Sequence, residues 1–191
     1  MTAQQDGGET DEALAVLAGS GDRRAFERLV TRHRTALYRF ARRYVGASDE
    51  AYDIVQESLV SAWGALGRYD PSRPFGAWLR AITLNKCRDH GRRGATRRLF
   101  LKAFAAGRSP VSDAQADQQA RQDKSEAEAR LARLDIAIAA LPRAYKEPLL
   151  LTLVEGLSHQ AAAAQLGISP KAVEMRLYRA RQTLTEWLGE G

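Results

Sequence analysis

Residues 156–181 read Gly156-Leu-Ser-His-Gln-Ala-Ala-Ala-Ala-Gln-Leu-Gly-Ile-Ser-Pro-Lys-Ala-Val-Glu-Met-Arg-Leu-Tyr-Arg-Ala-Arg181. Ser158 is a good N-cap for a short Ala-rich helix, and Gly167 supplies the permissive backbone that a tight turn needs. Ser169 then caps a second helix with Pro170 at its first position, where a missing N–H costs nothing. The stretch therefore predicts a helix-turn-helix, a motif whose second helix commonly reads DNA.

The second of these helices has two different faces. An apolar stripe at alternating four- and three-residue spacing is expected to be buried, and it consists of Val173, Leu177, Ala180, Leu184 and Trp187. The other side is cationic and partly aromatic, as major-groove reading requires, and it consists of Lys171, Glu174, Met175, Arg176, Tyr178 and Arg179. The alternative is an ordinary helical hairpin with a solvated charged face, because the motif alone is only moderately specific.

Basic residues outnumber acidic ones in this chain of 191 residues, 29 against 23, for a net charge of +6. The excess is concentrated between Ser72 and Arg108, where Asp89 is the only acid, whereas the first 22 residues hold acids and no base. A basic surplus of this kind favours a polyanionic partner such as nucleic acid.

The single cysteine, Cys87, excludes an intramolecular disulfide and fits a reducing compartment. No apolar run approaches the ~20 residues needed to span a bilayer. The first residues have neither the charged nor the apolar region of a secretion signal. We therefore expect a soluble, cytoplasmic protein.

Helical periodicity predicts an all-α fold of two small helical domains joined by a flexible linker, with the helix-turn-helix at the C-terminal end. After a disordered N-terminus at 1–10, the first domain is expected at 11–93, with a short helix at 11–19 and long helices from Ala25, Ser48 and Pro74. Large apolar groups are scarce from 94 to 130, the expected linker. The second domain is expected at 131–188, with helices at 131–141 and 145–154 before the helix-turn-helix.

Each long helix of the first domain has an expected inward face. On the first helix it consists of Phe26, Leu29, Val30, Leu37, Phe40 and Tyr44. On the second it consists of Tyr52, Val55, Leu59, Ala62 and Trp63. On the third it consists of Phe75, Trp78, Leu79 and Ile82. Three long helices with these side chains can build one compact core.

Two polar groups in the first domain are candidates for binding. Asp53, Gln56 and Glu57 share one helix face at i, i+3 and i+4, and such a face suits a partner that offers Arg or Lys. For this triplet alone, a solvated face is the more common explanation.

The second group lies on the next helix, where Asn85, Arg88 and Arg92 follow one another on one face. An amide beside a basic ridge can hold phosphates and read a base edge. The preceding loop, with Tyr69 and Asp70, could receive an unstacked base against the aromatic ring. The alternative is a charged helix face at the surface.

Taken in order, these motifs resemble those of a known family. They are Asp-x-x-Gln-Glu, an aromatic helix ending Asn-x-x-x-Asp-x-x-Arg-Arg, a linker, Leu-Pro, and a terminal helix-turn-helix ending Arg-Ala-Arg. From about residue 11 to 188 the chain resembles a bacterial extracytoplasmic-function (group IV) sigma factor of the sigma-70 family. It is similar to the minimal members, which keep only domains two and four.

The resemblance implies an alternative RNA polymerase sigma factor that recognises promoter −10 and −35 elements, with an anti-sigma factor as a further partner. It implies docking on the clamp coiled coil of the largest polymerase subunit by Asp53, Gln56 and Glu57. It implies capture of a flipped −10 base by Tyr69, Asp70, Arg80 and Asn85, and backbone contacts by Arg88, Arg92 and Arg93. It implies −35 recognition by Lys171, Glu174, Met175, Arg176, Tyr178 and Arg179.

Enzyme and metal chemistry find little support in the sequence. The three histidines lie on separate segments, and there is no Gly-rich phosphate loop or nucleophile elbow. Cys87 and His90 stand at i, i+3, but two ligands do not make a metal site. We therefore expect no catalytic residues, no metal and no cofactor. The remaining alternatives are a stand-alone helix-turn-helix transcriptional regulator and a sigma mimic that titrates regulators without touching DNA.

Overall fold

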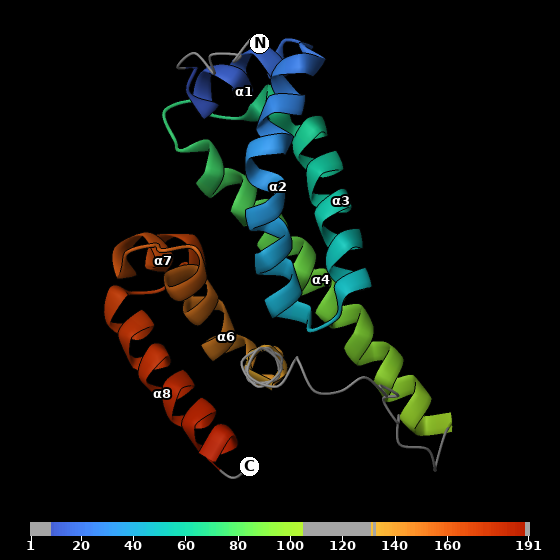
Figure 1. Ribbon diagram of the computed structural model, residues 1–191, viewed down its shortest axis with the longest axis vertical. Coiled ribbons are helices and arrows are strands. Elements are labelled where there is room, and N and C mark those ends of the chain that lie inside the picture. The colour runs from blue at the N-terminus through green and yellow to red at the C-terminus, as the bar shows by residue number, and fades with distance from the viewer. Residues whose placement is uncertain (1–8, 105–130, 132, 190–191) are drawn as a thin grey trace, which may run out of the picture. The chain divides into compact units, whose positions relative to one another are not determined.

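The computed structural model describes residues 9–104, 131 and 133–189, with the backbone alone for residues 93–104. Every regular element within these residues is helical (Figure 1), so the expected all-α fold is confirmed. The chain forms two compact units, of which the first comprises Met1–Arg42 and Ala47–Cys87 and the second comprises Arg43–Gly46 and Arg88–Gly191. No helix in the described part is both long and apolar enough to cross a membrane.

Four α-helices and one 3-10 turn supply the first unit. They are α1 (Asp11–Gly19), α2 (Arg23–Val45), α3 (Ser48–Ala65), η1 (Leu66–Arg68) and α4 (Phe75–Phe104), and the C-terminal parts of α2 and α4 belong to the second unit. Their ends follow local chemistry: the Thr10 hydroxyl accepts a hydrogen bond from Ala13 N at 3.2 Å at the start of α1. Gly46 ends α2 in the left-handed region, at φ 85°.

The core of the first unit lies between α2, α3 and α4. Phe75 at the start of α4 is buried, whereas Trp63, which was expected to face inward, is 38% exposed and meets Phe26 at a centroid distance of 4.9 Å. The expectation that Tyr52 faces inward is wrong, since its side chain is 59% exposed. The buried stripe of α3 begins one residue earlier, at Ala51, and the step of one residue turns Tyr52 toward solvent.

Helix α4 is longer than the periodicity indicated. It continues to Phe104, beyond the expected domain end at Arg93. Residues 95–104 contain no proline and several good helix formers, and Gly94 alone costs a helix only about 1 kcal/mol. A glycine was therefore too weak a signal to end the helix. The rest of the expected linker, 105–130, and residues 1–8 of the expected disordered N-terminus lie outside the described residues.

The second unit is built around α8 (Pro170–Gly189), which packs against α6 (Arg143–Leu149) and α7 (His159–Leu166). Residues 133–140 are also helical. Pro148 lies inside α6 and offers no N–H to the preceding turn, and the chain widens into a π-helical turn, η2 (Leu150–Val154). The Thr152 hydroxyl stabilises the widened turn by donating a hydrogen bond to the Pro148 carbonyl at 2.8 Å.

The apolar stripe of α8 is buried over only part of its length. Val173, Leu177 and Ala180 are buried, whereas Trp187 is 54% exposed, so the expected burial of Trp187 is wrong. Trp187 and Leu188 instead line an open groove of about 270 Å³ against the helix at 133–140. Helical spacing predicted which side of α8 is apolar, but it did not predict how far along the helix that side is buried by other helices.

Candidate nucleic-acid interface

The helix-turn-helix forms through the capping residues that the sequence singled out. The Ser158 hydroxyl accepts from Ala161 N at 3.1 Å to start α7, and Gly167 ends that helix in the left-handed region at φ 67°. The Ser169 hydroxyl accepts from Ala172 N at 3.1 Å to start α8. These caps fix where α8 begins, and the buried Val173 and Leu177 fix its rotation.

The outward face of α8 presents most of the residues expected to read DNA. Lys171, Glu174, Met175, Tyr178 and Arg179 are exposed, whereas Arg176 is half-buried. Hydrogen bonding by the Lys171 ammonium, 2.9 Å away, lowers the pKa of the Glu174 carboxyl. A hydrogen bond with Tyr145 raises the pKa of Arg179.

On α3, Asp53, Gln56 and Glu57 lie on one exposed helix face, as their spacing indicated. Glu57 pairs with Lys86 of α4 at 3.7 Å. The same face includes Val60, 71% exposed, which the sequence reading overlooked because it considered only polar residues. The spacing of Val60, four residues after Gln56, was the available signal. The face therefore offers carboxylates, an amide and one apolar side chain to solvent.

The loop between η1 and α4 differs from the expectation at Tyr69. Its side chain is only 9% exposed, with ring centroids 5.5 Å from Phe75 and 5.2 Å from Trp78, and burial raises its pKa. Tyr69 therefore anchors the loop and offers no open ring for a base. Asp70 is exposed and accepts from Ser72 N at 3.0 Å, and hydrogen bonding by Ser72 lowers the pKa of Asp70.

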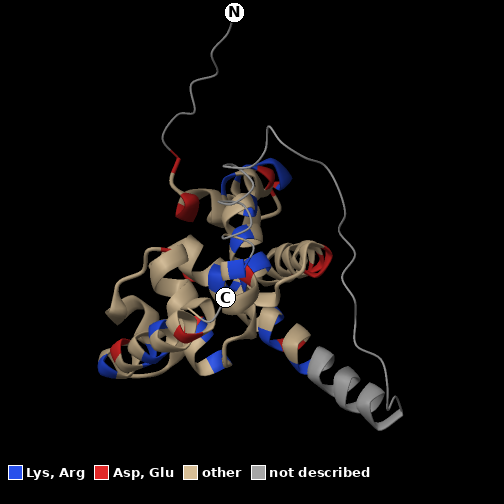
Figure 2. Cartoon of the chain, turned by 60° about the horizontal axis from the view of Figure 1, so that its bottom comes forward, with Lys and Arg blue, Asp and Glu red and all other residues tan. Residues whose placement is uncertain are grey.

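Farther along α4 the candidate residues have unequal surroundings. Asn85 is exposed, and Arg80 is half-buried. The exposed Arg92 pairs with Asp89, and the side chain of Arg93 lies outside the description. Figure 2 shows Lys and Arg interspersed with Asp and Glu on the described helices. Part of the basic stretch from Ser72 to Arg108 lies beyond the described side chains.

Arg88 does not lie on an open basic ridge. Within the second unit it donates two hydrogen bonds to Glu147, which also accepts from Arg143 at 2.7 Å and from the Tyr44 hydroxyl at 3.1 Å. Burial, which leaves Glu147 only 5% exposed, raises its pKa, but the hydrogen bonds and charges of Arg88 and Arg143 outweigh burial and lower it. Sequence reasoning missed Glu147, for which the available signal was an acid directly before the apolar run at 148–151.

The described residues bring no three His, Cys, Asp or Glu side chains together as a metal site would. Cys87 is buried in α4.

Comparison with known proteins gives matches along both parts of the chain. Residues 29–98 match the family described as Sigma-70 region 2, and residues 131–184 match Sigma-70, region 4. The RNA polymerase sigma factor CnrH of Cupriavidus metallidurans is 39% identical over 94% of this chain and 95% of its own. The RNA polymerase sigma factor CarQ of Myxococcus xanthus is 33% identical over 89% of this chain and 92% of its own.

Solved structures agree with these matches. The structure of CnrH in complex with the cytosolic domain of CnrY is 37% identical in sequence, covers 95% of this chain and 99% of its own, and superposes with a TM-score of 0.70. The sigma factor RpoE bound to the anti-sigma factor NepR from Bartonella quintana, 24% identical, has the same fold, with a TM-score of 0.63 over 86% of this chain and 96% of its own.

Proposed function

The chain belongs to the sigma-70 family as an extracytoplasmic-function (group IV) sigma factor, and on that premise we propose that it binds core RNA polymerase and directs promoter-specific initiation of transcription. We propose residues 11–93 as the region-2 domain, 131–188 as the region-4 domain and 94–130 as the connection between them. The protein acts as a binding factor without catalysis of its own, in the cytoplasm where polymerase and chromosome meet.

The observation that supports this function most directly is the outward face of α8. A helix-turn-helix with exposed Glu174, Met175, Tyr178 and Arg179 on its second helix can enter a major groove. Arg pairs with guanine, Glu accepts from cytosine, and Met or Tyr packs on a thymine methyl. We assign −35 recognition to this face, with Lys171 at its start and the half-buried Arg176 at its edge.

Core polymerase docks on the exposed face of α3. Asp53 and Glu57 offer carboxylates to basic groups, Gln56 offers an amide, and Val60 adds an apolar contact at the same face. Interfaces of this mixed composition bind through a few central residues surrounded by polar ones.

The −10 element is recognised by the loop before α4 and by the exposed side of α4. Asp70, Arg80 and Asn85 contact the unstacked base, while Tyr69 supports the loop from within. Arg92 and Arg93 hold phosphates, and Arg88 joins them when it leaves Glu147. CnrH and RpoE have each been solved with a bound partner, CnrY or the anti-sigma factor NepR, and we propose an anti-sigma factor as a partner of this chain too.

In vitro transcription tests the function: the purified chain is combined with core polymerase and a promoter library, and start sites are mapped. Defined start sites that need both components are expected. DNA binding without polymerase, and without start sites, would indicate a stand-alone regulator. Absence of both DNA binding and start sites would indicate a sigma mimic that titrates regulators without touching DNA. A variant with Glu57→Lys and Val60→Asp is expected to lose start sites while keeping its helical content.

A further inference from the structure

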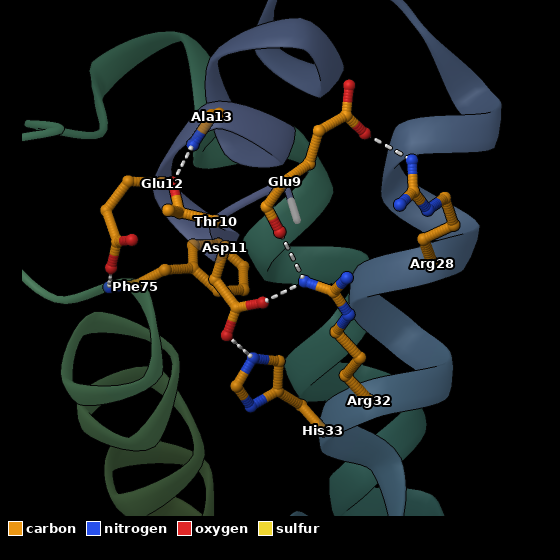
Figure 3. A network of polar contacts seen from close by, with 9 residues as sticks. All are labelled: Glu9, Thr10, Asp11, Glu12, Ala13, Arg28, Arg32, His33 and Phe75. Atoms are coloured by element: carbon orange, nitrogen blue, oxygen red, sulfur yellow. Dashed lines mark hydrogen bonds and ion pairs between the residues drawn. The ribbon is translucent and has the colours of Figure 1, made fainter. Parts of the chain in front are cut away.

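The loop that follows η1 is held at both ends by α1. At the first end α1 packs against η1, and a Cβ at Gly19 would lie 3.3 Å from the carbonyl oxygen of Leu66. At the other end Glu12 Oε1 accepts a hydrogen bond from Phe75 N at 3.0 Å (Figure 3). The first N–H groups of a helix have no partner within the helix, so Glu12 caps α4 from outside.

A set of ion pairs fastens α1 to α2 (Figure 3). Asp11 accepts from Arg32 at 2.8 Å and lies 2.7 Å from His33 Nε2. Arg32 also donates to the carbonyl of Glu9 at 3.0 Å. The Asp11 carboxylate is partly shielded from solvent, so these pairs are screened less than fully exposed ones. The acidic first turn of α1 is thereby fixed at a defined place on α2.

His33 extends this connection to the start of α4. Its ring meets Phe75 edge-on at a centroid distance of 5.5 Å. A Cβ on Gly76 would lie 3.5 Å from His33 Cε1 and 3.6 Å from Arg80 Nη1. Asp11, His33, Gly76 and Arg80 therefore form a continuous series of neighbours that runs from α1 to a residue assigned to the −10 element.

We propose that Asp11 and Glu12 are positioning residues for −10 recognition: α1 holds the loop after η1 and the first turn of α4 so that Asp70 and Arg80 face an unstacked base. This role rests on the proposed function. It concerns a helix that precedes residue 29, where the match to Sigma-70 region 2 begins. A displacement of about 1 Å in a binding group is enough to weaken recognition, so a cap at Phe75 can govern affinity without touching DNA.

Two substitutions at one position separate positioning from mere stability. Glu12→Ala removes the acceptor at Phe75 N, whereas Glu12→Gln keeps an amide oxygen that can accept the same hydrogen bond. The control is Glu27→Ala, which removes a carboxylate from the exposed side of α2. All three are made in the full chain.

Amide hydrogen exchange of the free chain is the first measurement. Glu12→Ala is expected to speed exchange at Ser72, Arg73 and Phe75 by about 3- to 30-fold, the range of a lost helix cap, with Glu12→Gln close to wild type. Equal exchange in Glu12→Ala and wild type overturns the proposal. Faster exchange throughout the first unit also overturns it, because Glu12 would then be a general stabiliser.

Binding of the holoenzyme to single-stranded DNA is the second measurement. The probe is the non-template −10 strand of a promoter found by the transcription assay. Glu12→Ala is expected to lose about 3- to 30-fold in affinity for this strand, with core binding and −35 duplex binding unchanged and with rescue by Glu12→Gln. Unaltered strand binding despite a loosened loop overturns the positioning role. A wild-type holoenzyme without start sites refutes the proposed function itself, and the exchange data still decide whether Glu12 fixes the loop.

Discussion

Arg88 forms a bidentate ion pair with Glu147, with Arg88 Nε 2.9 Å from Glu147 Oε1 and Arg88 Nη2 2.7 Å from Glu147 Oε2. A buried carboxylate is tolerated only when charged donors surround it, and Arg143 and Tyr44 supply the other bonds. These two bonds engage Nε and Nη2, so only the remaining N–H donors of the Arg88 guanidinium are left for a phosphate. The contact therefore bears on stability and on DNA binding at once.

Glu147→Gln is expected to destabilise the second unit at neutral pH by up to about 3 kcal/mol, because removal of one charge leaves Arg88 and Arg143 without their carboxylate. The amide oxygen of Gln retains part of the hydrogen bonding, which keeps the loss at the lower end of the usual range. Urea unfolding of the full chain measures the change, and Glu186→Gln on the exposed side of α8 is the control.

The same carboxylate makes stability depend on pH. The pKa of Glu147 is lower in the folded chain than its ordinary value of about 4.3, so its contribution is fully present above that value and is lost as the pH falls through the lowered pKa. Urea midpoints of wild type are expected to fall below about pH 4.3 more steeply than those of Glu147→Gln. Parallel pH profiles would contradict a lowered pKa at Glu147.

Gly46→Ala is expected to destabilise the chain by about 1–2 kcal/mol or more, because φ is 85° there and an L side chain is strained in that region. The added Cβ would also lie 2.9 Å from the Cβ of Ala139. Gly64→Ala in α3 is the matched control, since its Cβ meets nothing within 4 Å. That control is expected to be neutral or slightly stabilising by thermal unfolding. Equal effects at both positions would refute the conformational argument.

Arg179→Ala is expected to weaken holoenzyme binding at the matching promoter by about tenfold to a hundredfold if Arg179 reads a base. Binding is measured on promoters that are permuted through the −35 element. A loss at one position indicates base reading, whereas a uniform loss with a smaller salt slope indicates a phosphate contact. Arg181→Ala, also an exposed arginine of α8, is the control. No loss at any promoter would remove α8 from recognition.

The α3 face is expected to depend on Val60 as well as on its charges. Val60→Asp should lower the affinity for core polymerase by at least about tenfold, because a central apolar contact becomes a charge that the partner must desolvate. The unfolding temperature should change little, since Val60 is exposed. Competition binding against wild type measures the affinity, with Glu50→Ala in the first turn of α3 as control. Retained affinity in Val60→Asp would place the docking surface elsewhere.

Local chemistry made the helix-turn-helix predictable from sequence. Ser158, Gly167 and Ser169 each act within a few residues along the chain, so their effect does not depend on the rest of the fold. The structure departs from the sequence-based predictions at residues whose exposure is set by tertiary packing. Tyr69 looked like an exposed stacking ring because nothing in the sequence places Trp78 against it. Glu147 looked unremarkable because Arg88, its partner, is 59 residues away in sequence.

The attachment of α1 changes where this protein can be divided. A fragment cut at residue 29, where the Sigma-70 region 2 match starts, would lose Asp11, Glu12 and the first turn of α2. It would also uncover the surface that Leu14 and Ala18 now bury. A fragment that keeps the bond from Arg32 to the Glu9 carbonyl has to begin no later than Glu9, twenty residues before the match does.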